Sequence, residues 1–153
     1  MDSREKYAKM AEKNNLPKLE DLEKNFSFKL SKDTENIKFD ILKGVEESII
    51  YAREVMEKLL FISESSSQSH LYEARFINRK KVFMSYKKIM ELKWKYRMVY
   101  FHTKEEDCQD FIRDSFDTWK KDIKPCIMEM CEKMEDAWKN YKNTKEERQR
   151  YFG

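Results

Sequence analysis

Residues that form tight turns are scarce in this 153-residue chain, which has two glycines, Gly44 and Gly153, and two prolines, Pro17 and Pro125. Tight β-hairpins depend on these residue types or on Asn-Gly and Asp-Gly pairs, and the sequence contains no such pair. The scarcity argues against a β-sheet protein and favours helices.

Cysteines and long apolar segments are also few. The three cysteines, Cys108, Cys126 and Cys131, form no CxxC pair, so the sequence indicates neither a disulfide framework nor a zinc site. The first residues lack the apolar stretch of a signal peptide, and no apolar run approaches the ~18 residues of a membrane span. We therefore expect an intracellular protein, cytoplasmic or nuclear, with free thiols.

Motifs that carry catalysis or hold cofactors are absent from the sequence. Two isolated glycines cannot form a phosphate-binding loop, and neither HExxH nor GxSxG occurs. The two histidines, His70 and His102, fall at opposite ends of one expected helix, too far apart to share a site. The acids of segment 105–110 are interpreted as residues placed at a helix N-terminus. We predict a protein that is not an enzyme, with no catalytic residues, metal, cofactor or small-molecule substrate.

Charge and aromatic residues are what the chain has in abundance. Charged residues make up 40% of the sequence and aromatic residues 14%. Because disordered chains are poor in aromatics, this combination predicts a real core beneath a highly charged surface. We predict one all-α domain over residues 1–153, a helical bundle of about four main helices in which the third and fourth are long.

Apolar periodicity and helix-boundary residues divide this domain into segments. A short helix is expected over 3–15 with Ser3 as its N-cap, followed by a helical turn from Pro17. A second helix is expected over 34–62, capped by Thr34 or Asp33, and its Gly44 is interpreted as merely tolerated, with a close helix crossing as the alternative. The remaining segments are a Ser-rich loop over 63–69, a helix over 70–101, a helix over 104–141 that begins after a capping box at Thr103 and is kinked near Pro125, and a tail over 144–153.

The expected helix over 70–101 is unusual because apolar residues occur on two of its faces. One stripe contains Val82, Ile89, Leu92, Tyr96 and Val99. The other stripe is the candidate apolar interface, and its members are Phe76, Phe83, Met90, Trp94 and Phe101. A helix with two apolar stripes must be covered on two sides. We therefore predict that one stripe packs in the core and that the other binds a partner if it is exposed.

The same helix is strongly basic. Glu91 is the one acid within 75–97, where the nine basic side chains are Arg75, Arg79, Lys80, Lys81, Lys87, Lys88, Lys93, Lys95 and Arg97. The segment that follows, 105–117, is strongly acidic. Two interpretations stay open. The two segments neutralise each other as antiparallel neighbours, or the basic residues form a surface for nucleic acid, anionic lipid or an acidic partner.

Short pieces of this region resemble the helical domain of GINS subunits, the four-part complex of the replicative helicase. They are 79–86 (RKKVFMSY), 89–96 (IMELKWKY), and the group Phe101, His102, Glu105, Glu106 and Phe111. The resemblance implies a non-catalytic scaffold subunit of a DNA-replication complex. It also implies that the first and fourth helical stripes are candidates for subunit contacts.

The leading hypothesis is a non-catalytic helical scaffold or adaptor that binds protein partners, as a hetero-oligomer or a homodimer. Methionine and aromatic residues on helical faces favour it, because both are enriched at adaptable interfaces. One alternative is a BAR-like module on an anionic membrane surface, which suits long, kinked, basic helices. The other is nucleic-acid binding through the basic helix 75–97, with an affinity that falls steeply as salt rises.

Overall fold

The computed structural model describes residues 1–102 and 104–142, and every regular element in that part of the chain is helical. In chain order the elements are α1 (Ser3–Asn14), α2 (Leu19–Phe26), α3 (Ile37–Leu60), α4 (Gln68–Glu73), α5 (Arg79–His102), α6 (Glu105–Thr118), the π-helical segment η1 (Trp119–Ile123) and α7 (Lys124–Lys139). The all-α prediction is confirmed. Because α6, η1 and α7 are continuous, the described residues contain six helices, and the predicted number of about four is wrong.

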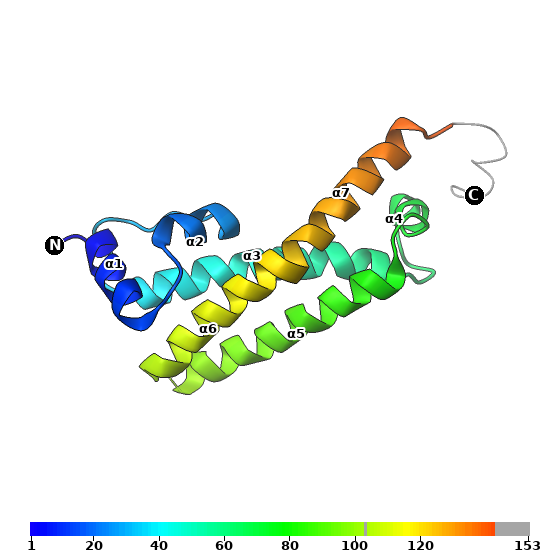
Figure 1. Ribbon diagram of the computed structural model, residues 1–153. Coiled ribbons are helices and arrows are strands. Elements are labelled where there is room, and N and C mark those ends of the chain that lie inside the picture. The colour runs from blue at the N-terminus through cyan, green and yellow to red at the C-terminus, as the bar shows by residue number, and fades with distance from the viewer. Residues whose placement is uncertain (103, 143–153) are drawn as a thin grey trace.

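Three long helices form the body of the molecule (Figure 1). The chain runs along α3, turns back through α4 into α5, and returns again along the continuous helix α6–η1–α7, so that α5 packs against both neighbours. The small helices α1 and α2 cover one end of α3, and the far end of α7 extends past the body toward α4 (Figure 1). Among the helices of the described residues, none has the length and apolarity needed to cross a membrane.

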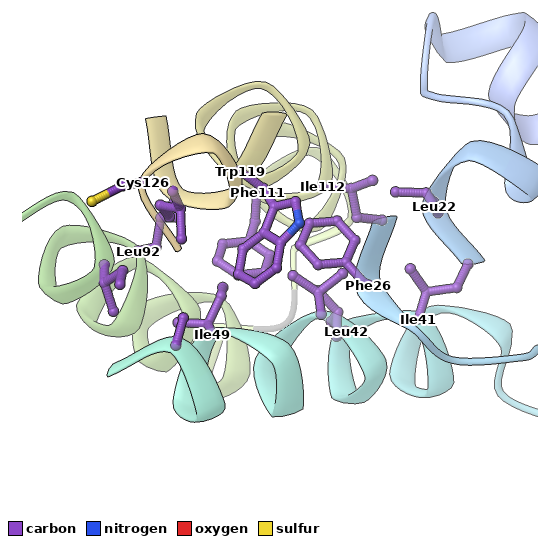
Figure 2. Close-up of a cluster of buried hydrophobic side chains, with 14 of the residues drawn as sticks. Leu22, Phe26, Ile41, Leu42, Ile49, Leu92, Phe111, Ile112, Trp119 and Cys126 are labelled. Carbon is purple, nitrogen blue, oxygen red and sulfur yellow. The ribbon is translucent and has the colours of Figure 1, made fainter. Parts of the chain in front are cut away.

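The core lies where α2, α3, α5 and the α6–η1–α7 helix meet (Figure 2). Phe26 of α2 packs on Trp119 of η1 with ring centroids 5.2 Å apart, and the indole nitrogen points toward the Phe26 ring. Phe111 and Ile112 of α6 are fully buried beside them. Each large apolar side chain buried in this way contributes about 1.5–3 kcal/mol. From α3 the core receives residues spaced by three and four, among them Ile41, Val45, Ile49, Ala52 and Met56.

Two helices begin on caps other than the predicted ones. The side chain of Asp2 caps α1 by accepting a hydrogen bond of 2.9 Å from the backbone N–H of Glu5, and Asn36 caps α3 in the same way. The predicted cap Ser3 is buried and donates its hydroxyl to the carbonyl of Thr34 at 2.9 Å, while the Thr34 hydroxyl bonds Asp40. The Ser3 hydroxyl joins the start of α1 to the segment before α3, and the Thr34 hydroxyl is occupied locally by Asp40 of α3, so neither side chain caps a helix.

The segment predicted as one helix over 70–101 contains two helices, α4 and α5, separated by the irregular residues 74–78. The Ser-rich loop ends two residues earlier than predicted, because Ser67 already caps α4 by accepting from the N–H of His70. Tyr72 turns toward α7 and donates its hydroxyl to the carbonyl of Ala137 at 2.7 Å. Asn78 then starts α5 by accepting from the N–H of Lys81 at 3.2 Å. The hydrogen bond of Tyr72 to α7 and the cap at Asn78 therefore interrupt the helix predicted over 70–101.

The irregularity predicted near Pro125 takes the form of the π-helical segment η1. The N–H of Lys124 bonds the carbonyl of Trp119, five residues earlier, and Pro125 has no N–H to continue an α-helical ladder. At its other end α6 has acids in its first turn as predicted, but its N-cap position is Lys104, which makes no side-chain cap bond. The predicted capping-box residue Thr103 and the predicted tail 144–153 lie outside the described residues.

Gly44 is required by a close contact, so its interpretation as merely tolerated is wrong. A Cβ atom at this position would lie 2.5 Å from Cγ of Phe28, well inside contact distance. The Phe28 ring, which comes from the segment after α2, sits directly on the backbone of α3. The contact is therefore made by an aromatic side chain and is not a crossing of two helices.

Candidate partner-binding surface

One apolar stripe of α5 is the core stripe. Val82, Ile89, Leu92 and Val99 are buried between α3 and the α6–η1–α7 helix. Tyr96 is half-buried and packs edge-on against Phe111 with ring centroids 5.7 Å apart. These residues are the contribution of α5 to the hydrophobic core.

The other stripe lies on the solvent side of α5. Phe83, Trp94 and Phe101 are 45%, 56% and 80% exposed, and Met90 is half-buried. Two exposed methionines that were not among the predicted interface residues, Met84 and Met98, extend the same surface. We call this surface the outward face of α5 and define it by the residues Phe83, Met84, Met90, Trp94, Met98 and Phe101.

Phe76, the fifth predicted interface residue, is not part of the outward face. It precedes α5 and packs against Tyr72 of α4 with ring centroids 5.1 Å apart. The rings of Tyr72 and of Trp138 in α7 pack at a tilt of 54° with centroids 4.8 Å apart, and the Trp138 indole N–H donates to Glu73 at 3.1 Å. Phe76 thus belongs to a separate aromatic cluster that fixes α4 to the end of α7.

Three of the nine basic side chains form ion pairs with the neighbouring helix. Lys88 Nζ lies 2.9 Å from Asp122 Oδ2. Lys81 pairs with Glu129, and Lys95 pairs with Asp114. Of these acids only Asp114 belongs to the acidic segment 105–117, so the neutralisation that was left open is partial and reaches beyond that segment into η1 and α7.

The other basic residues have different surroundings. Arg79 donates to the carbonyl of Leu60 at 2.6 Å and so ties the start of α5 to the end of α3. Lys93 Nζ and Arg97 Cζ lie 5.6 and 4.8 Å from the ring centroid of Trp94, at cation–π distance. Arg75 lies in a similar way over its neighbour Phe76, 5.7 Å from the ring centroid.

Two further cations, Lys80 and Lys87, are exposed on α5. For neither side chain does the described structure include an ion pair within the chain. With Arg97 and Lys93 they make the surroundings of the outward face basic, and Glu91 is the one acid of α5 nearby. The exposed part of α5 is therefore an apolar surface with positive charge along it.

Contacts with α3 hold α5 in place from the other side. The Tyr86 hydroxyl donates to Glu57 of α3 at 2.8 Å, and burial together with this hydrogen bond raises the pKa of Tyr86. Tyr96 is held by Glu46 in a similar way, and burial raises its pKa as well. Both phenols therefore stay protonated as donors near neutral pH, and they fix the rotation of α5 about its axis.

The described structure has surface hollows of different sizes. The cavity between α3 and α5, lined by Glu46, Arg53 and Tyr96 among others, has a volume of about 60 Å³. That is room for very few water molecules. The hollow between α1 and α2, beside Ala11 and Leu19, has a volume of about 500 Å³, and the one between α4 and α7, beside Tyr72 and Ala137, has about 550 Å³. Within residues 1–102 and 104–142, no three His, Cys, Asp or Glu side chains converge in a way that could hold a metal ion.

Comparisons of the chain with protein-family models, curated proteins and solved structures find no match. On the surface of the described residues, the outward face of α5 combines exposed aromatic and methionine side chains with neighbouring cations.

Proposed function

We propose that this protein is a non-catalytic helical interaction module that binds a protein partner through the outward face of α5. The observation that carries the proposal is the row of aromatic and methionine side chains on the side of α5 turned away from the core. Contiguous exposed apolar surface marks interaction sites on globular proteins. Tryptophan and arginine are enriched at binding hot spots, and methionine packs adaptably.

The way in which α5 is held supports the same proposal. Its inner side packs in the core, its lysines pair with the α6–η1–α7 helix, and Arg79 and Tyr86 bond to α3. A helix fixed on three sides presents a preformed surface. Binding to such a surface costs less ordering entropy than binding to a mobile segment.

A narrower form of the proposal comes from the similarity of residues 79–86 and 89–96 to the helical domain of GINS subunits. In that form the protein is a scaffold subunit of a heteromeric DNA-replication complex, and its partner is another subunit. The residues that carry the resemblance include Phe83 and Trp94, which lie on the outward face.

A second candidate function is binding of single-stranded nucleic acid along α5. The observation that favours it is the pairing of cations with an exposed aromatic ring, Lys93 and Arg97 on Trp94. Bases stack on such rings while cations contact the phosphates. A labelled oligonucleotide should then bind with an affinity that falls steeply between 50 and 200 mM salt, by roughly tenfold or more.

Site-specific photo-crosslinking tests the leading proposal. A photoreactive amino acid replaces Trp94 in one variant and Tyr51, an exposed aromatic residue of α3, in a matched control. In the cells that naturally contain the protein, position 94 should crosslink to a defined protein and position 51 should not. If position 94 yields no protein adduct, or the same adducts as position 51, the proposal is wrong.

A further inference from the structure

We infer that the partner segment on the outward face of α5 is an acidic amphipathic helix and that a second copy of this chain cannot take its place. The inference rests on the proposed function and adds the chemistry of the partner. Its basis is the position of two cations, Lys87 and Arg97, inside the apolar row.

The residues of α5 that a partner helix would contact are spaced three and four positions apart along the chain. Steps of four and three residues along the exposed side of α5 give the seam Phe83, Lys87, Met90, Trp94, Arg97 and Phe101. Such alternating steps define the contact line of two helices that pack side by side. Four seam positions are apolar and two are cationic, and none is acidic.

A second copy of α5 does not fit this seam. In an antiparallel pair centred between Met90 and Trp94, Lys87 of each copy faces Arg97 of the other. In a parallel pair each cation faces its own counterpart. Like charges placed opposite each other across an interface cost several kcal/mol. Both orientations therefore oppose the association of two copies along the outward face.

A membrane surface fits poorly for a different reason. Helices that lie in a bilayer surface separate an apolar face from a polar one, with cations on the polar side. At 100° per residue, Lys87 and Arg97 lie only about 40° on either side of the line through Phe83 and Phe101. Inserting the aromatic rings into lipid would carry both cations toward the acyl chains.

An acidic helix satisfies the same geometry. Lys87 and Arg97 are ten positions apart, or about 15 Å along the axis at 1.5 Å per residue. A partner helix with carboxylates at this separation and apolar side chains between them would pair both cations while covering Met90 and Trp94. Lys80, exposed about two turns before Lys87, extends the positive charge toward the start of α5.

Designed peptides test the charge of the partner. Two fluorescent amphipathic helices carry the same leucines along the seam, and carry either glutamates or lysines at the positions that face Lys87 and Arg97. Fluorescence anisotropy measures their affinity for the whole protein. The acidic peptide should bind at least tenfold more tightly than the basic one, and Lys87→Glu with Arg97→Glu should reverse that preference. The control Lys9→Glu with Lys121→Glu makes the same change of net charge at exposed sites on α1 and η1 and should leave the preference intact.

Three outcomes would overturn the inference without overturning the proposed function. An acidic peptide that binds no more tightly than the basic one overturns the assigned chemistry, whereas the proposed function stands as long as position 94 crosslinks to a protein. Sedimentation of the protein alone tests whether two copies associate along the outward face. A dimer that is dissociated by Trp94→Ser would overturn the inference. Vesicles of phosphatidylserine and phosphatidylcholine test whether the protein binds a membrane through this face. Vesicle binding that is abolished by Lys87→Glu with Arg97→Glu would also overturn the inference.

Discussion

Lys88 of α5 and Asp122 of the π-helical segment η1 form the middle rung of a ladder of three ion pairs, with 2.9 Å between Nζ and Oδ2. The lysines are seven residues apart, at 81, 88 and 95. Their partners, at 129, 122 and 114, are seven and then eight residues apart. A π turn holds one residue more than an α turn, so η1 absorbs the additional residue and keeps the ladder in register.

Changing the length of η1 tests this explanation. Deletion of Lys121, an exposed residue, together with Pro125→Ala, which removes the proline that would clash inside an α-helix, should leave a regular helix with both outer ion pairs intact. It should change the free energy of unfolding by no more than about 1 kcal/mol. Insertion of an alanine at the same place should rotate α7 by about 100° and withdraw Cys126 and Met130 from the core, at a cost of about 3 kcal/mol or more. Urea unfolding measures both, and equal losses for the two variants would contradict the explanation.

The two stripes of α5 should respond differently to truncation. Ile89→Ala removes a fully buried side chain and should lower the free energy of unfolding by about 2–4 kcal/mol. Trp94→Ser removes a larger side chain from the outward face and should change it by no more than about 0.5 kcal/mol. Chemical denaturation of both variants decides the point. A large loss for Trp94→Ser would mean that the outward face is packed within the chain.

Gly44 should resist substitution even though it lies inside a helix. Alanine is about 1 kcal/mol better than glycine in a helix, but here its Cβ would strike the Phe28 ring. We expect Gly44→Ala to lower the free energy of unfolding by about 1–3 kcal/mol. In a Phe28→Ala background the same change should be stabilising by up to about 1 kcal/mol, since the obstacle is gone. Additive effects in this double-mutant cycle would rule out the proposed contact.

The ion pair of Arg4 and Glu23 should make stability depend on acid pH. Two Arg4 hydrogen bonds of 2.5 and 2.9 Å, and a further one of 2.9 Å from the Leu30 N–H, hold the pKa of Glu23 below its ordinary 4.5. A depressed pKa in the folded state gives stability that is present above pH 4.5 and is lost as the pH falls below it.

The matching variant is Glu23→Gln, which keeps the shape of the side chain and removes its charge. It should lower the free energy of unfolding at pH 7 by about 1–3 kcal/mol, and the difference from the unmodified protein should shrink toward pH 3. Unfolding curves across this pH range measure the effect. A difference that stays constant with pH would show that the charge of Glu23 contributes nothing.

Helical periodicity allowed much of the fold to be predicted, because it is a property of a single segment. The buried side of α3, the apolar side of the α6–η1–α7 helix and an irregularity near Pro125 were all accessible in this way. Helix boundaries were less accessible. Ser3 and Thr34 have the side chains of N-caps, yet a tertiary hydrogen bond occupies Ser3 and a local one to Asp40 occupies Thr34.

For the candidate partner-binding surface too, one part could be predicted from the sequence and another part could not. The sequence alone determined that α5 carries two apolar stripes and nine basic residues nearby, since the spacing of residues along one helix contains that information. Which stripe is buried was decided by tertiary structure, because burial depends on which neighbours pack against a helix. The stripe of Ile89 lies between α3 and α6–η1–α7, where apolar burial stabilises it, and exposed ion pairs at Lys81, Lys88 and Lys95 flank that packing. The stripe of Trp94 is left facing outward as a consequence of that packing.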